Sequence, residues 1–203
     1  MDETKTLARI RLVTARYNEL HGLGGVALGL AFTIAFGIYF AMDARSEGAG
    51  VAAMIGALAL TVPGVALVLR FYRATYGRVQ QPPRRANRGL WHGVFCGIFI
   101  GLEPILGTGR MLTPFVVIGL LFLRVAMRDW PLRGYHLFGA AACALGIVIQ
   151  LQAPAFERPL ISPPAAASFL LLGLACIPIG FLDHRLLATT MKRTAGEEAS
   201  NRA

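Results

Sequence analysis

Apolar residues along this chain occur in long continuous blocks, and polar residues are largely confined to the segments between them. A block of about 20 apolar residues is long enough to cross roughly 30 Å of hydrocarbon as a helix. Because the runs are continuous and not alternating, they predict helices and not barrel strands. We therefore expect an all-α six-transmembrane-helix bundle, with spans at Gly22–Met42, Ala49–Leu69, Gly89–Gly107, Met111–Met127, Gly134–Ala153 and Ala165–Leu182.

The segment before the first block has a different periodicity. Between Thr4 and Leu20, apolar residues recur at steps of three and four, which predicts an amphipathic helix. The residues of its apolar stripe are Leu7, Ile10, Val13, Tyr17 and Leu20. A basic helix of this kind lies in the headgroup layer of a membrane, or else docks on a partner or on the protein's own loops. We favour the headgroup layer.

These patterns divide the chain into three parts. Residues 1–21 form the interfacial amphipathic helix, residues 22–184 form the transmembrane domain, and residues 185–203 form a short cytoplasmic tail. The tail is small and polar, so we expect it to be disordered. We also expect the second helix to continue beyond the membrane and to stop at Gly77, before Pro82 and Pro83.

Basic residues indicate the orientation of the spans. The segments on one side of the six predicted spans hold 17 Lys and Arg residues, and those on the other side hold three, namely Arg45, Arg110 and Arg158. The positive-inside rule then places both termini in the cytoplasm of a multi-pass inner-membrane protein. The net charge of +9 has the same origin, so we expect contact with anionic lipid headgroups and no nucleic acid partner.

The longest predicted cytoplasmic connection is unusually rich in arginine. It contains six arginines and no acidic residue: Arg70, Arg73, Arg78, Arg84, Arg85 and Arg88. Orientation alone requires fewer, so these residues are candidates for a lipid or partner contact. Orientation without any such contact remains the simpler alternative.

Small residues at four-residue spacing predict close helix packing. They are Gly89, Gly93, Gly97 and Gly101 on the third span, Gly48, Ala52, Gly56 and Gly64 on the second, and Gly25 and Gly29 on the first. Such stripes form flat grooves that let two helix backbones approach closely. Packing within the bundle is the favoured interpretation, and a homo-oligomer seam is the alternative.

Ionisable and polar groups within apolar spans are the default functional candidates in a membrane protein. Glu103 is the best of these, with Arg110 and Gln150 as the nearest polar groups by depth. The alternative is that the carboxylate of Glu103 reaches the nearby outer membrane surface and has no function there.

The four histidines all map to the cytoplasmic ends of predicted spans. His92 and Cys96 share one helix face, and Asp183 adjoins His184, so convergence would make a metal or proton site. No recognised metal-ligand spacing supports this, and we expect no cofactor and no metal.

Neither a serine-hydrolase elbow, nor a Walker loop, nor a dinucleotide fingerprint is present in the sequence. The sequence therefore favours a non-catalytic subunit, anchor or regulatory component with a basic cytoplasmic face. Its partners would be membrane lipids, a second copy, or another membrane protein. The alternative is a small-solute or ion transporter that uses Glu103.

Overall fold

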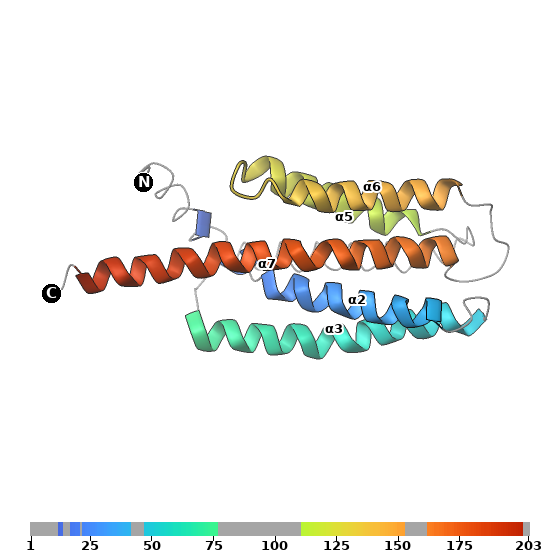
Figure 1. Ribbon diagram of the computed structural model, residues 1–203, viewed down its shortest axis with the longest axis horizontal. Helices are drawn as coiled ribbons and strands as arrows, with labels where there is room; N and C mark the ends of the chain where they lie inside the picture. The colour runs from blue at the N-terminus through green and yellow to red at the C-terminus, as the bar shows by residue number, and fades with distance from the viewer. Residues whose placement is uncertain are drawn as a thin grey trace, which may run out of the picture.

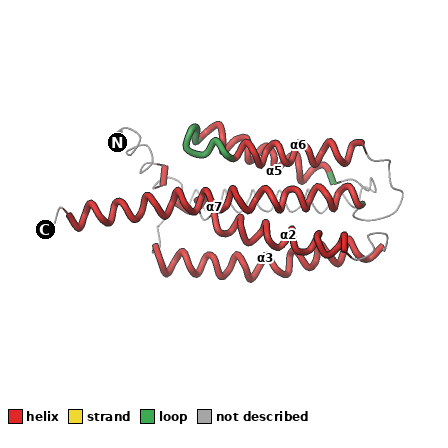
Figure 2. Tube along the Cα trace, viewed as in Figure 1, coloured by secondary structure: helices red, strands yellow, loops and turns green. Residues whose placement is uncertain are grey.

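The computed structural model of the chain describes residues 12–13, 17–20, 22–41, 47–76, 111–152 and 162–200. Within these ranges every regular element is a helix (Figures 1 and 2). The elements are η1 (Tyr17–Leu20), α2 (Gly22–Ala41), α3 (Glu47–Tyr76), α5 (Leu112–Arg128), α6 (His136–Gln152) and α7 (Pro163–Ser200). Five of the predicted spans coincide with these helices, and the third, Gly89–Gly107, lies outside the described residues.

The long helix α7 is the centre of the arrangement. It packs against α2 on one side and against α6 on the other. Helix α3 packs on α2, and α5 packs on α6, so two antiparallel hairpins flank α7 (Figure 1). We use the term basic end for the end of the bundle that holds the turn between α5 and α6, the last turns of α3, and η1.

Three described helices are long and apolar enough to cross a membrane, over Gly22–Ala41, Ile55–Tyr76 and Pro163–Met191. They indicate a membrane protein. Helix α7 has 38 residues, which is about 57 Å at 1.5 Å per residue and exceeds the roughly 30 Å of a hydrocarbon core. Its C-terminal turns, which follow the residues that pack at the basic end, therefore extend beyond the bundle (Figure 1).

Reciprocal glycine pairs bring α2 and α7 into backbone contact. A Cβ atom placed on Gly29 would lie 2.6 Å from the carbonyl oxygen of Gly173, and one on Gly173 would lie 2.9 Å from that of Gly29. Seven residues away, Gly22 and Gly180 meet in the same way, at 2.1 and 2.4 Å. Small residues that allow this approach are a main source of helix association in lipid.

Two apolar clusters hold the ends of the bundle. At the end opposite the basic end, Phe36 of α2 stacks on Phe169 of α7, with ring centroids 5.3 Å apart, and Met111 and Phe115 of α5 join them. At the basic end, Tyr72 of α3 and Leu187 of α7 pack with the segment that precedes α2.

That preceding segment uses part of its predicted apolar stripe on the protein itself. Val13, Tyr17 and Leu20 are buried against α3 and α7. Residues 17–20 form a 3-10 turn, and most of Thr4–Arg16 lies outside the described residues. The described part thus docks on the protein's own helices, where we had favoured the headgroup layer.

The C-terminal tail also differs from the expectation. Residues 185–200 continue α7 as helix, whereas we expected a disordered tail from residue 185. The hydroxyl groups of Thr189 and Thr190 donate to the carbonyls of Arg185 and Leu186, at 2.7 and 2.8 Å, so they do not interrupt the helix. Lys, Arg, Ala and Glu residues beyond them are good helix formers.

The predicted small-residue stripe of α3 is only partly used for packing. Gly64 approaches the Cβ of Ala27 on α2, at 3.2 Å. Ala52 is exposed, and a Cβ on Gly56 would have nothing within 4 Å, so both face away from the described helices. The surroundings of Gly48 are not described, and the whole stripe of the third span lies outside the described residues.

Candidate functional site

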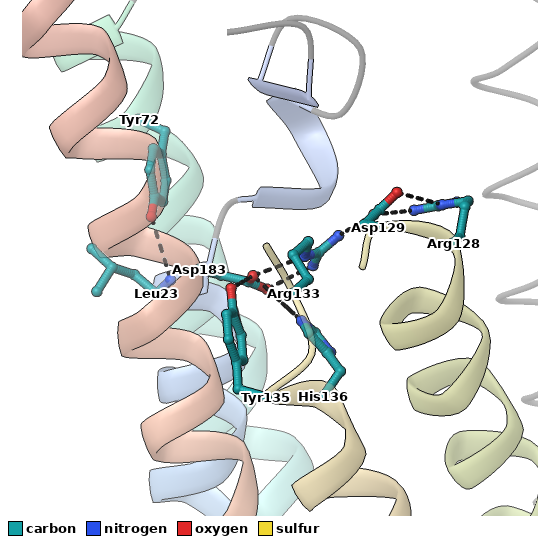
Figure 3. Close-up of polar contacts among 8 residues, drawn as sticks. All are labelled: Leu23, Tyr72, Arg128, Asp129, Arg133, Tyr135, His136 and Asp183. Atoms are coloured by element: carbon teal, nitrogen blue, oxygen red, sulfur yellow. Dashed lines mark hydrogen bonds and ion pairs between the residues drawn. The ribbon is translucent and has the colours of Figure 1, made fainter. Parts of the chain in front are cut away.

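A network of buried charges lies at the basic end, where the turn between α5 and α6 meets α7. The turn follows α5 without a break in backbone bonding, because Asp129 N–H donates to Val125 and Arg133 N–H donates to Asp129. His136 N–H then donates to the carbonyl of Arg133 at 3.0 Å as α6 begins. This compact turn directs three polar side chains, those of Arg133, Tyr135 and His136, toward one residue of α7 (Figure 3).

That residue is Asp183, which accepts four hydrogen bonds. Arg133 donates through Nε and Nη2 to the two carboxylate oxygens, at 3.0 and 2.7 Å. Tyr135 donates its hydroxyl proton to Oδ1, and His136 Nε2 lies 3.2 Å from Oδ2. A carboxylate offers about four lone-pair sites, so those of Asp183 are all occupied.

A second aspartate extends the network on the turn side. Asp129 accepts two bonds from Arg128, both at 3.0 Å, and one from Arg133 Nη1 at 3.3 Å. Arg133 therefore bridges two carboxylates, and its side chain is only 3% exposed. Arg is suited to this position because its planar guanidinium presents several donors in a fixed geometry.

The pKa shifts of the turn residues follow from this pairing. Burial alone would raise the pKa of Asp129, but the hydrogen bonds and charges of Arg128 and Arg133 outweigh burial and hold it below its usual value. Burial alone would lower the pKa of Arg133, yet its bonds to Asp183 raise that pKa. Burial also raises the pKa of Tyr135, and the charge of Asp183 adds to this effect. All three groups keep their ordinary charge at neutral pH.

His136 is the one member of the network with an unpaired atom. Its ring packs between Phe122 and Tyr135, with centroids 5.6 and 5.0 Å away, and is 4% exposed overall. Nδ1 is buried and has no hydrogen-bond partner. Because a carboxylate oxygen only accepts, Nε2 is the donor in the contact with Asp183.

The other described histidine makes a separate contact. The hydroxyl group of Tyr72 on α3 and Nδ1 of His184 share a hydrogen bond of 2.8 Å, and the Leu23 N–H at the start of α2 donates to the same hydroxyl at 3.4 Å. This chain joins α2, α3 and α7. His136 and His184 thus have different hydrogen-bond partners, Asp183 and Tyr72. No group of three metal-ligating side chains gathers among the residues that the structure describes.

Gln150 is the one predicted intramembrane polar residue that the structure describes. Its side chain is 1% exposed, and it accepts from Met111 N–H at 2.7 Å and donates to the Met111 carbonyl at 3.3 Å. It therefore caps the start of α5 from α6. Glu103 and Arg110, its predicted partners, lie outside the described residues.

Of the arginines predicted as a lipid or partner contact, two are described. Arg70 and Arg73 are exposed on the last turns of α3, at the basic end. Arg78, Arg84, Arg85 and Arg88 lie outside the described residues, as do His92 and Cys96.

The network around Asp183 was not predicted from the sequence, although a signal for it existed. Asp183 follows the predicted sixth span by one residue, and Arg133 precedes the predicted fifth span by one. Adjacent antiparallel spans bring such positions to the same depth, so opposite charges there are candidates for a pair.

We expect Gln150→Met to lower the free energy of unfolding by about 1–3 kcal/mol, because the variant leaves a buried N–H and a buried carbonyl of Met111 without partners. The matched control is Gln152→Met, since that side chain lies exposed two residues later on the same helix. Unfolding of both variants in mixed micelles measures the difference. Equal stability of the two would contradict the capping role.

The chain matches no protein-family model, and no curated protein and no solved structure is significantly similar to it.

Proposed function

We propose that this protein crosses the inner membrane six times, with both termini in the cytoplasm, and serves as a non-catalytic subunit or anchor that presents a basic face. The distribution of Lys and Arg residues, 17 against three, supports this orientation. The arginines whose side chains the structure describes agree with it, because they lie in the last turns of α3 and α5, in the turn after α5, or beside His184 on α7. They are Arg70, Arg73, Arg124, Arg128, Arg133 and Arg185.

The connection between α3 and α5 supports the proposed count of spans. Helix α3 ends at the basic end, where Tyr72 contacts His184, and α5 begins at the opposite end, where Met111 packs with Phe36 and Phe169. The chain between them must pass from one end of the bundle to the other. We assign this crossing to the apolar block Gly89–Gly107.

The observation that carries the non-catalytic role is that Asp183, Gln150 and Ser168 use their side chains to join helices. All four acceptor positions of Asp183 are occupied by donors of the turn. The side-chain amide of Gln150 is hydrogen-bonded to the backbone of Met111 at the start of α5. Ser168 likewise donates to carbonyls of its own helix and of α6. Side chains used in this way join helices and hold no acceptor position free for a substrate. In the described part of the chain, the buried side-chain atoms without a partner are Thr33 Oγ1 and His136 Nδ1.

The basic face is the part that we assign to interaction. The exposed arginines at the basic end suit anionic lipid headgroups, and a second copy or another membrane protein would dock beside them. The exposed small residues of α3 are compatible with such a neighbour in the membrane.

Flux measurements and cross-linking together test this role. We expect purified protein in liposomes to carry no proton or ion flux above that of empty liposomes. In native membranes, we expect a cross-linker to trap it in a complex of defined size. Flux that Glu103→Gln abolishes would overturn the proposal in favour of transport, and the absence of any complex would remove the subunit role.

A further inference from the structure

The outer surface of the turn between α5 and α6 combines a charged and an aromatic side chain beside an apolar stripe. In the proposed six-span arrangement α5 crosses the membrane. It has 17 residues and is about 25 Å long, so this arrangement places the turn after it near the edge of a hydrocarbon layer about 30 Å thick. Residues exposed along one face of α5 and the turn are Val116, Leu120, Leu123, Met127 and Trp130. This stripe leads from the middle of the bundle to the turn.

Trp130 is held in a defined position at the end of the stripe. Its side chain is 65% exposed, yet its ring lies against the backbone of Gly134, where an added Cβ would come within 2.6 Å of Cζ3. The indole is thus fixed on one face and open on the other. Amphipathic rings with this exposure favour the headgroup layer.

Arg124 places positive charge beside the stripe. The cluster of Arg124, Arg128 and Arg133 with Asp129 and Asp183 has one net positive charge when His136 is neutral. Both aspartates are bound by Arg128 and Arg133, whereas Arg124 has no carboxylate partner within the described part of the chain. Arg124 and Arg128 are four residues apart and so lie on one helix face.

We infer that Arg124 and Trp130 form a binding site for the headgroup of an anionic phospholipid, with an acyl chain along the exposed stripe of α5. The guanidinium group of Arg124 binds the phosphate, and the indole lies at the level of the glycerol backbone. A long arginine side chain whose Cα lies within the hydrocarbon layer can still place its guanidinium group in the headgroup layer. This inference rests on the proposed orientation, which places the turn at the cytoplasmic leaflet.

Tryptophan fluorescence tests this site directly. The chain has two tryptophans, so Trp91→Phe leaves Trp130 as the only one. The probes are vesicles of phosphatidylcholine that contain an equal fraction of either brominated phosphatidylglycerol or brominated phosphatidylcholine. We expect the anionic probe to be enriched at Trp130 about fivefold, as one interfacial arginine would give.

Three variants of the Trp91→Phe protein separate the site from general electrostatics. Arg124→Gln should abolish the enrichment, so that the two probes quench to about the same extent, while Arg124→Lys should retain most of the enrichment. The double variant Arg70→Gln, Arg73→Gln removes exposed arginines of α3 at the same end and should leave it unchanged. Equal quenching by both probes in the parent protein, or equal losses in the α5 and α3 variants, would overturn the site. Quenching by neither probe would instead show that the turn is outside the membrane, and the assignment of α5 as a membrane span would fail with it.

Discussion

Replacement of Asp183 by alanine is expected to lower the free energy of unfolding by about 3–5 kcal/mol, because it leaves the guanidinium of Arg133 buried without its main partner. The Arg133 side chain is 3% exposed, so solvent cannot compensate for the lost carboxylate. Tyr135 and His136 lose their acceptor in the same variant. Unfolding in mixed micelles, followed by circular dichroism, measures the loss.

The double variant Arg133→Met, Asp183→Leu serves as the control for this prediction. Removing both charges leaves no unpaired ion, so most of the stability should return. Together with the single variants Arg133→Met and Asp183→Leu, it completes a double-mutant cycle that gives a coupling energy for the pair. If Asp183→Ala costs less than about 1 kcal/mol, or if the double variant is no more stable than the single one, the network does not join the turn to α7.

Replacement of Gly29 by valine should have the second-largest effect, a loss of about 1–3 kcal/mol or more. The new Cβ would lie 2.6 Å from the carbonyl oxygen of Gly173, and backbone atoms cannot move aside as a flexible side chain can. Helices α2 and α7 must therefore separate along the contact that both glycine pairs create. The same unfolding measurement detects this loss.

Gly37 provides a matched control on the same helix. A Cβ at Gly37 would have nothing within 4 Å, so Gly37→Val introduces the same side chain without a collision. We expect its stability to stay within about 0.5 kcal/mol of the parent, as for most surface substitutions. Similar losses for Gly29→Val and Gly37→Val would mean that close backbone packing is not what holds α2 against α7.

The helices could be predicted from the sequence because hydrophobic blocks dominate it. α2 was predicted from Gly22 to Met42 and found from Gly22 to Ala41, and α3 continues beyond Leu69 to Tyr76, as expected. The predicted stop of that helix at Gly77 lies outside the described residues. Continuous apolar runs leave the chain little choice of secondary structure in lipid, because every backbone group must be bonded within its own segment.

What each helix faces could not be predicted in the same way. Gly22 and Gly29 of α2, seven residues apart, make the closest backbone contacts with Gly180 and Gly173 of α7, whereas we had emphasised stripes of four-residue spacing. Gly25, which the sequence paired with Gly29, also packs on α7, where an added Cβ would lie 3.6 Å from the Cα of Gly180. Ala52 and Gly56 belong to such a stripe, yet they face away from the described helices. Spacing shows that a helix can approach another backbone, but only the tertiary arrangement selects the partner.

The polar site shows the same division between local and long-range information. The sequence marked Asp183 and His184 as neighbours, and their side chains then bond to different helices, to the turn before α6 and to Tyr72 of α3. One step along a helix rotates a side chain by about 100°, so adjacent residues face different neighbours. Gln150 was predicted beside Glu103, and it is found on the backbone of Met111.

The orientation of the bundle is the central claim, and labelling of single added cysteines tests it most directly. Ser200→Cys lies at the end of α7, and Ser46→Cys lies in the predicted outer connection. The parent protein controls for the native cysteines, of which Cys143 and Cys176 are buried. A membrane-impermeant maleimide should label Ser46→Cys in intact cells and Ser200→Cys only in inverted vesicles. Labelling of Ser200→Cys in intact cells would contradict the account.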